Sequence, residues 1–237
     1  MNYGQHGRHE QHGQHEQHSR PGDRRPWEVR VGAKTALLAW GRNPHAALRD
    51  GLTAQPGTAH EVAARALPGA RLTAVGSLPL AEALLPPDGM VYAASFPGVD
   101  LVCCADVAAG LAAQPETLPD HLRPGPGQRL YVHHMSSVTD SFYASVRTGG
   151  AEERGVLAVL EQGAWEEGER RDFELPYWRG ERPPWDGYEG PPPFHPLHLG
   201  EAYLLHDFGF TAESAPQLPP APLDPFTISV YGFRVGQ

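Results

Sequence analysis

Histidine, serine and aspartate, the side chains used by nucleophilic hydrolases, lie close together in one stretch of this sequence. Residues 130–146 read LYVHHMSSVTDSFYASV and contain His133, Ser136 and Asp140. A histidine can take a proton from a nucleophile while a carboxylate orients its imidazole ring. The stretch lacks the G-x-S-x-G turn that exposes a nucleophilic serine, and neighbouring residues of a strand point to opposite faces. A hydrolase is therefore the alternative function, with His133, Asp140 and His195 as candidate catalytic residues.

A second set of polar side chains has the spacing of a helix and the chemistry of metal ligands. His195, His198 and Glu201 follow one another at intervals of three, which makes neighbours of the two histidines on a continuous helix. Together with His133 or His134 they would supply nitrogen and oxygen ligands for zinc. Pro196 argues against such a site, because a helix that begins at this proline leaves His195 outside as a cap-like residue. These three residues are the candidate metal ligands, and we expect no cofactor.

Aromatic residues surround a proline-rich segment between residues 183 and 193. The rings in question are Trp178, Trp185, Tyr188 and Phe194. Aromatic and arginine side chains on a loop are typical of binding patches. The alternative is that the rings fold back as a lid over the core. We take the four residues as the candidate binding residues.

Two adjacent cysteines and an acidic charge balance limit the possible classes of protein. The formal net charge is −9, which does not fit the basic surface that nucleic acid requires. Cys103 and Cys104 provide no disulfide framework, because a bridge between adjacent cysteines is strained. No apolar run is long enough to span a bilayer, and the polar N-terminus does not resemble a signal peptide. We therefore expect a cytoplasmic protein that binds neither membrane nor nucleic acid.

The elements that must position these residues are predicted from hydrophobic periodicity. From Val138 to Val146 apolar and polar residues alternate, as in a half-buried antiparallel strand. Asp140 falls on the apolar face of this pattern, so we expect it near a sheet edge or in an ion pair. Further strands are predicted at residues 35–40, 71–78, 90–94, 99–104, 156–160 and 227–235. Helices are predicted from Pro44 and at residues 59–67, 107–113 and 197–208, with a short helix or turn at 80–85.

This order of elements lacks the strict alternation of strand and helix that builds parallel sheets. Its strongest strands are joined by short turns, which favours α+β architecture over a doubly wound fold. We predict a single α+β domain at residues 31–237, with a largely antiparallel sheet flanked by a few short helices.

The first 30 residues have a different composition. Histidine recurs at every third position from His6 to His18, and so little apolar surface cannot offset the entropy lost on ordering. We expect a disordered low-complexity tail, with weak affinity for metal ions as the alternative reading. The codons required for Trp27-Glu28-Val29 can contain a ribosome-binding sequence, so a further hypothesis is that translation starts at Val31.

Several short motifs point to a family. They include VGAKTALLA at residues 31–39, SFPGVD at 95–100, FELPYW at 173–178 and FHPL at 194–197. The sequence resembles an uncharacterised actinobacterial family, a domain of unknown function whose members open with Met-Gly-Ala-Lys-Thr. The resemblance covers about residues 31–235 and implies no assigned activity. His198 departs from it, because the family pattern implies glutamate at that position.

A binding or interaction module is the function that these observations favour. No recognisable catalytic set is present, and the candidate binding residues lie on a loop. We expect a protein or small-molecule partner to bind the face around Asp140 and residues 178–194.

Overall fold

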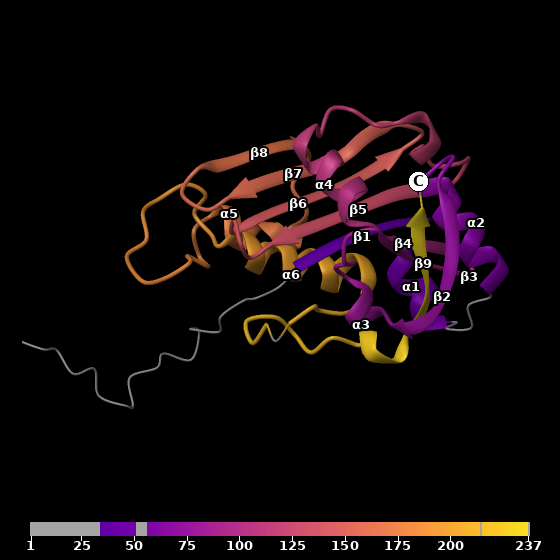
Figure 1. Cartoon of the computed structure of the whole chain (residues 1–237). Helices are drawn as coiled ribbons and strands as arrows, with labels where there is room; N and C mark the ends of the chain where they lie inside the picture. The colour runs from indigo at the N-terminus through magenta and orange to yellow at the C-terminus, as the bar shows by residue number, and fades with distance from the viewer. Residues whose placement is uncertain (1–33, 51–55, 214, 237) are drawn as a thin grey trace, which may run out of the picture. The chain divides into compact units, whose positions relative to one another are not determined.

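A nine-stranded antiparallel sheet is the scaffold of this protein (Figure 1). The computed structural model describes residues 34–50, 56–213 and 215–236, so the predicted His-rich tail and the start at Val31 lie outside the described residues. The strand order is β2-β9-β3-β4-β1-β5-β6-β7-β8. The strands are β1 (Lys34–Gly41), β2 (Arg71–Pro79), β3 (Met90–Phe96), β4 (Val99–Cys103), β5 (Arg129–Ser136), β6 (Ser141–Thr148), β7 (Ala151–Val159), β8 (Gly163–Gly168) and β9 (Ser229–Gly236).

Short helices and turns connect these strands. The α-helices are α1 (Pro44–Asp50), α2 (Pro56–Ala66), α3 (Leu80–Ala83), α4 (Ala105–Ala113), α5 (Leu175–Trp178) and α6 (Pro196–Phe208). The 3-10 helices are η1 (Asp120–Leu122), η2 (Asp172–Glu174) and η3 (Pro225–Thr227). None of the helices in the described part of the chain is long and apolar enough to cross a membrane.

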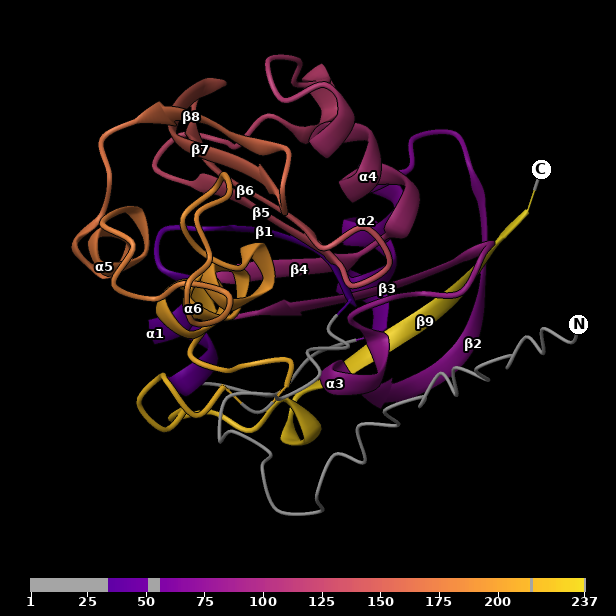
Figure 2. The same cartoon turned by 90° about the vertical axis from the view of Figure 1, so that its left-hand side faces the viewer.

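Helices cover both faces of the sheet, which explains the apolar composition of its central strand. Figure 2 shows α2 and α4 over one face and α1, α3 and α6 over the other. Within β1, Leu38 and Trp40 belong to the core under α2 and α4, whereas Leu37 and Ala39 belong to the core under α6. A strand buried on both faces has no polar side to alternate with. The predicted α+β fold with its antiparallel sheet is confirmed.

The prediction that a strand begins at Val138 and carries Asp140 on its apolar face is wrong. They form two strands, β5 and β6, joined by a turn, and Asp140 lies in this turn with a φ of 43°. Asp140 is therefore not on the apolar face of a strand. Strand β6 is also buried on both faces, because Phe142 packs under α6 while Tyr143 packs on the opposite side.

Strand β8 was not predicted, because its residues have no apolar periodicity. It lies at the edge of the sheet and pairs with β7 alone. Glu166 of β8 accepts hydrogen bonds from Arg154 and Arg170. Edge strands commonly carry charged side chains, which prevent pairing with another chain.

Candidate functional site

His133, the first candidate catalytic residue, is buried and makes structural contacts with both ring nitrogens. Its Nδ1 atom lies 2.8 Å from the Thr35 hydroxyl oxygen, and its Nε2 atom lies 2.9 Å from the Gly200 carbonyl oxygen. A carbonyl only accepts, so Nε2 carries the proton and Nδ1 accepts from Thr35. Burial lowers the pKa of His133 to about 4. The imidazole is thus neutral and ties β5 to α6, with neither nitrogen left for catalysis.

Asp140 and His195, the other two candidate catalytic residues, lie close to each other. The His195 Nε2 atom lies 3.9 Å from an Asp140 carboxylate oxygen. The Nδ1 atom of His195 accepts a hydrogen bond from the backbone N–H of Leu197, which confirms the prediction that His195 caps this helix. The structure therefore brings together Asp140 and His195. The third candidate, His133, uses both ring nitrogens in its contacts with Thr35 and Gly200.

The candidate metal ligands point in different directions. His195 and His198 are neighbours, with ring centroids 5.0 Å apart. Burial lowers the pKa of both rings, to about 4 for His198, where His195 and Arg182 add to the effect. Glu201 instead accepts hydrogen bonds from the backbone N–H groups of Ala212 and Glu213.

Metal-binding side chains are therefore not gathered at this helix end. Within residues 34–50, 56–213 and 215–236, no three His, Cys, Asp or Glu side chains are arranged to hold a metal ion. The buried carboxylate of Glu201 serves instead to order the chain that follows α6.

The four candidate binding aromatics divide into two pairs. Phe194 is fully buried, and Trp178 packs edge-on against it with centroids 5.0 Å apart. Trp185 is 41% exposed and contacts Tyr188 on the same loop, with centroids 4.6 Å apart. Trp178 and Phe194 therefore fold back onto the core, as in the alternative that the rings form a lid. The second pair lies on the surface, where it is open to a partner.

The structure also contains a cleft that the sequence analysis did not identify. Two adjoining hollows of about 530 Å³ and 300 Å³ share four lining residues, Arg129, Tyr131, His206 and Asp207. We call them together the arginine cleft, because five arginines line them: Arg42, Arg49, Arg129, Arg154 and Arg171. The acidic residues that line them are three: Glu153, Glu169 and Asp207.

The register of the sheet positions one wall of this cleft. Gly41, the last residue of β1, pairs with Arg129, the first residue of β5. Arg42 therefore emerges at the same end of the sheet as Arg129. The Tyr131 hydroxyl donates a hydrogen bond to the Arg42 carbonyl at 3.1 Å, which fixes the turn into α1. Burial raises the pKa of Tyr131, with a further contribution from the charge of Asp207, so the hydroxyl stays protonated.

The C-terminal end of α6 forms the opposite wall. An Asp207 carboxylate oxygen lies 2.7 Å from Nη1 of Arg171 and 2.9 Å from Nδ1 of His206. The His206 ring stacks on Phe173 with centroids 4.5 Å apart. These contacts hold the His206 ring in place, although its side chain remains 53% exposed to the cleft.

A buried ion pair supports the floor of the cleft. Arg154 donates to both oxygens of Glu174, and its Nη2 atom lies 2.5 Å from Oε2. The Tyr203 hydroxyl donates to the same carboxylate at 2.7 Å. Neither Arg154 nor Glu174 is exposed by more than 3%, so this pair is part of the scaffold rather than a contact for a ligand.

Among the cleft residues, Arg42 has the most freedom to bind a ligand. Its side chain is exposed and forms no ion pair within the described part of the chain. Arg129 forms an ion pair with Glu153, in which its Nε atom lies 2.9 Å from a carboxylate oxygen, and its side chain is 43% exposed. Guanidinium groups form paired hydrogen bonds with the oxygens of carboxylates and phosphates. The cleft can therefore hold an anionic group at its Arg42 end.

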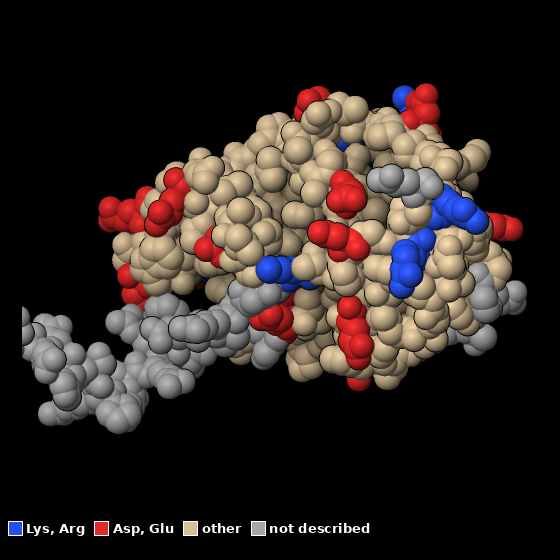
Figure 3. All heavy atoms as spheres, viewed as in Figure 1, with Lys and Arg blue, Asp and Glu red and all other residues tan. Residues whose placement is uncertain are grey.

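Positive charge is sparse on this acidic protein, which makes its concentration in one cleft informative. Figure 3 shows one face of the molecule, on which acidic side chains are scattered and basic ones are few. The arginines of the cleft come from the turn between β1 and α1, from α1, β5 and β7, and from the segment after β8. The pairing of Gly41 with Arg129 is the signal that could have identified these arginines as neighbours. It can be recognised only when the order of the strands in the sheet is known.

Fold and site together define an α+β domain that carries an arginine-lined cleft and no recognisable catalytic set among its described residues. Comparison with known proteins identifies the family. A model described as a family of unknown function, DUF6928, matches residues 35–233, so this chain belongs to that family. No curated protein and no solved structure matches the chain.

Proposed function

We propose that this chain is a binding protein whose ligand is a small molecule with a phosphate or carboxylate group. The ligand occupies the arginine cleft, with its anionic group between Arg42 and Arg129. The single observation that carries this proposal is the pairing of Gly41 with Arg129, which sets two guanidinium groups at one end of a hollow.

Size and charge both support a small anion. The larger hollow, of about 530 Å³, falls within the range of roughly 300–1,000 Å³ that small-molecule sites occupy. Arg129 and Arg171 are already paired with carboxylates, so the exposed Arg42, which forms no ion pair among the described residues, adds the positive charge that favours an anion in a protein whose net charge is −9. A protein partner is the alternative, with the exposed Trp185 and the half-buried Tyr188 beside it as its contact.

A hydrolase built on His133, Asp140 and His195 has less support. His133 is occupied by Thr35 and Gly200, and a buried neutral imidazole with no free nitrogen is not available to activate water.

Two further expectations belong to this proposal. The free thiols of Cys103 and Cys104 are buried, and burial raises the pKa of both, which fits a protein of the reducing cytoplasm. The abundance of alanine, arginine and proline fits an actinobacterial source.

The proposal is tested by the thermal stability of the full chain in inorganic phosphate and in succinate, each compared with chloride at equal ionic strength. A ligand that binds the folded state raises the midpoint of unfolding. We expect a rise with at least one of the two anions, and the two arms distinguish phosphate from carboxylate chemistry.

Substitutions locate the effect. Arg42→Ala should abolish most of the rise, whereas Arg234→Ala, which removes an exposed arginine of β9, should preserve it. Equal responses of the two variants, or no response of the wild-type chain to either anion, would overturn the proposal.

A further inference from the structure

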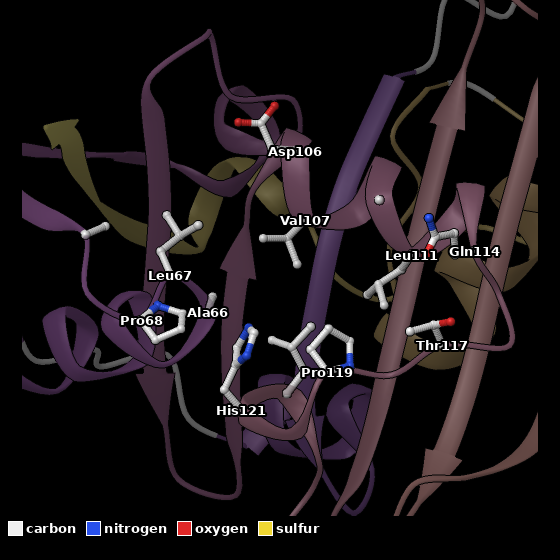
Figure 4. A pocket seen from close by; sticks show the side chains of 13 residues that line it. Ala66, Leu67, Pro68, Asp106, Val107, Leu111, Gln114, Thr117, Pro119 and His121 are labelled. Atoms are coloured by element: carbon white, nitrogen blue, oxygen red, sulfur yellow. The ribbon is translucent and has the colours of Figure 1, made fainter. Parts of the chain in front are cut away.

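The opposite face of the sheet carries a hollow with different chemistry. A cavity of about 480 Å³ lies between α2, α4 and η1, and most of the side chains that line it are apolar. Figure 4 shows Leu67 and Val107 facing each other across this cavity, with Leu111 and Pro119 beside them. Its polar residues, such as Asp106 and Gln114, are exposed to solvent. We call it the α2–α4 cavity.

Specific hydrogen bonds hold the wall of this cavity in place. The indole Nε1 atom of Trp40 donates to the carbonyl of Leu122 at 2.8 Å. Arg65 donates to the carbonyl of Arg123 at 2.7 Å, and its guanidinium lies 4.4 Å from the Trp40 ring centroid. These bonds attach η1 to α2 and to the sheet, so the hollow does not depend on loop side chains alone.

A glycine keeps the cavity open. Gly110 lies in the interior of α4, in the sequence ADVAAGLAA, where glycine is less favourable than alanine. Glycine in a helix is usually explained by a close approach of another element. A Cβ atom at Gly110 would meet no atom within 4 Å, so no such contact requires it here. The missing side chain instead leaves space in the cavity that Gly110 lines.

The dimensions and the charge of the cavity indicate its occupant. The volume of about 480 Å³ falls within the range of roughly 300–1,000 Å³ that small-molecule sites occupy. An apolar lining makes the binding of a charged group costly, and Asp106 at the rim repels anions. Small-molecule sites are mostly apolar, with a few polar groups that orient the ligand.

We propose that the α2–α4 cavity binds a small, uncharged, predominantly apolar molecule, such as one with an aromatic ring system or a short alkyl chain. This site is distinct from the arginine cleft, which lies on the other face of the sheet and takes an anion. The ligand packs against Leu67, Val107 and Leu111, and Gly110 provides the room for it.

The test uses the full-length protein and N-phenyl-1-naphthylamine, an uncharged apolar dye whose fluorescence rises in apolar surroundings. We expect saturable binding at one site per chain. Gly110→Leu should weaken binding at least tenfold, because its side chain occupies the cavity, and Gly110→Ala should weaken it less. Gly57→Leu is the matched control, since Gly57 is a helical glycine outside the cavity with no atom within 4 Å of its Cβ position.

Two measurements separate this proposal from others. Circular dichroism establishes whether each variant is folded. If Gly110→Leu does not fold, Val107→Trp replaces it as the variant that fills the cavity. Arg42→Ala should leave dye binding unchanged, so a failure of the arginine cleft proposal does not affect this result. The proposal is overturned if the wild-type chain shows no saturable binding, or if the cavity-filling variants bind as well as Gly57→Leu.

Discussion

The Nε2 atom of His133 lies 2.9 Å from the carbonyl oxygen of Gly200, and this hydrogen bond joins the centre of the sheet to α6. Gly200 permits the approach, because a Cβ atom there would lie 2.3 Å from the sulfur of Met135. A histidine that resembles a catalytic residue in the sequence is thus a structural residue. Its neutrality and its close helix contact lead to the first two predictions.

The stability of the protein should depend on His133 at acidic pH. The pKa of this residue falls from 6.5 in the unfolded chain to about 4 in the folded one, so the folded state favours the neutral ring. Its contribution is fully present above pH 6.5 and is lost as the pH falls towards 4, by roughly 3 kcal/mol. Urea unfolding should show a smaller loss between pH 7 and pH 4 for His133→Gln than for the wild-type chain. His121→Gln is the control, and an unchanged pH dependence in His133→Gln would contradict the assignment.

Two glycine substitutions in helices should have opposite effects. Gly200→Ala places a methyl group against Met135 and Phe142 in the core and should destabilise by about 1–3 kcal/mol. Gly110→Ala meets no atom and should stabilise by about 0.5–1 kcal/mol through helix propensity. Chemical unfolding of both variants measures the difference. The account of α6 packing fails if Gly200→Ala is as stable as the wild type.

Glu201 should produce a pH dependence of the opposite sign. Burial raises its pKa from 4.5 to about 7, so the folded state prefers the protonated acid. The folded chain then binds more protons than the unfolded one between these values, and stability increases as the pH falls. This group should add on the order of 2 kcal/mol between pH 8 and pH 5.

Glu201→Gln isolates this contribution. On going from pH 8 to pH 5, the unfolding free energy of this variant should change by about 2 kcal/mol less favourably than that of the wild-type chain. Glu116→Gln, which alters an exposed side chain, should behave as the wild type. The assignment is contradicted if Glu201→Gln responds to acidification as the wild type does, or gains more stability than the wild type.

The ion pair under the arginine cleft should be required for stability. Glu174→Ala leaves the buried guanidinium of Arg154 without its main partner and also removes the acceptor of Tyr203. Removal of one member of a buried pair costs about 3–5 kcal/mol. Guanidinium chloride unfolding should show a loss of this size, compared with a negligible change for the exposed Glu167→Ala. A loss below about 1 kcal/mol would mean that water reaches Arg154.

The central strand of the fold could be predicted because the apolar composition of its residues follows directly from their burial. Residues 36–40 are apolar without interruption, as expected for β1, whose two faces are covered by helices. Asp140 could not be placed correctly, because the alternation of polar and apolar residues continues through the turn. Val138, which is 76% exposed, and its polar neighbours imitate a strand there.

The candidate site was less accessible to sequence reasoning than the fold. Arg42 and Arg129 are 87 positions apart, and their proximity depends on the pairing of β1 with β5. Pairing between strands that are distant in sequence leaves no local pattern. The α2–α4 cavity has one local signal, a glycine in an alanine-rich helix, but its meaning requires the space around Gly110.

The central claim is that the arginine cleft binds an anion, and the Nε–Hε signals of arginine in ¹H–¹⁵N nuclear magnetic resonance spectra test it directly. Titration of the labelled full-length protein with inorganic phosphate or succinate should shift the signals of Arg42 and Arg129 in a saturable manner. The signal of Arg234, which lies outside the cleft, should not move. Saturable shifts confined to the cleft are the predicted result. Equal shifts at Arg234, or no shift at Arg42 with either anion, would contradict the account.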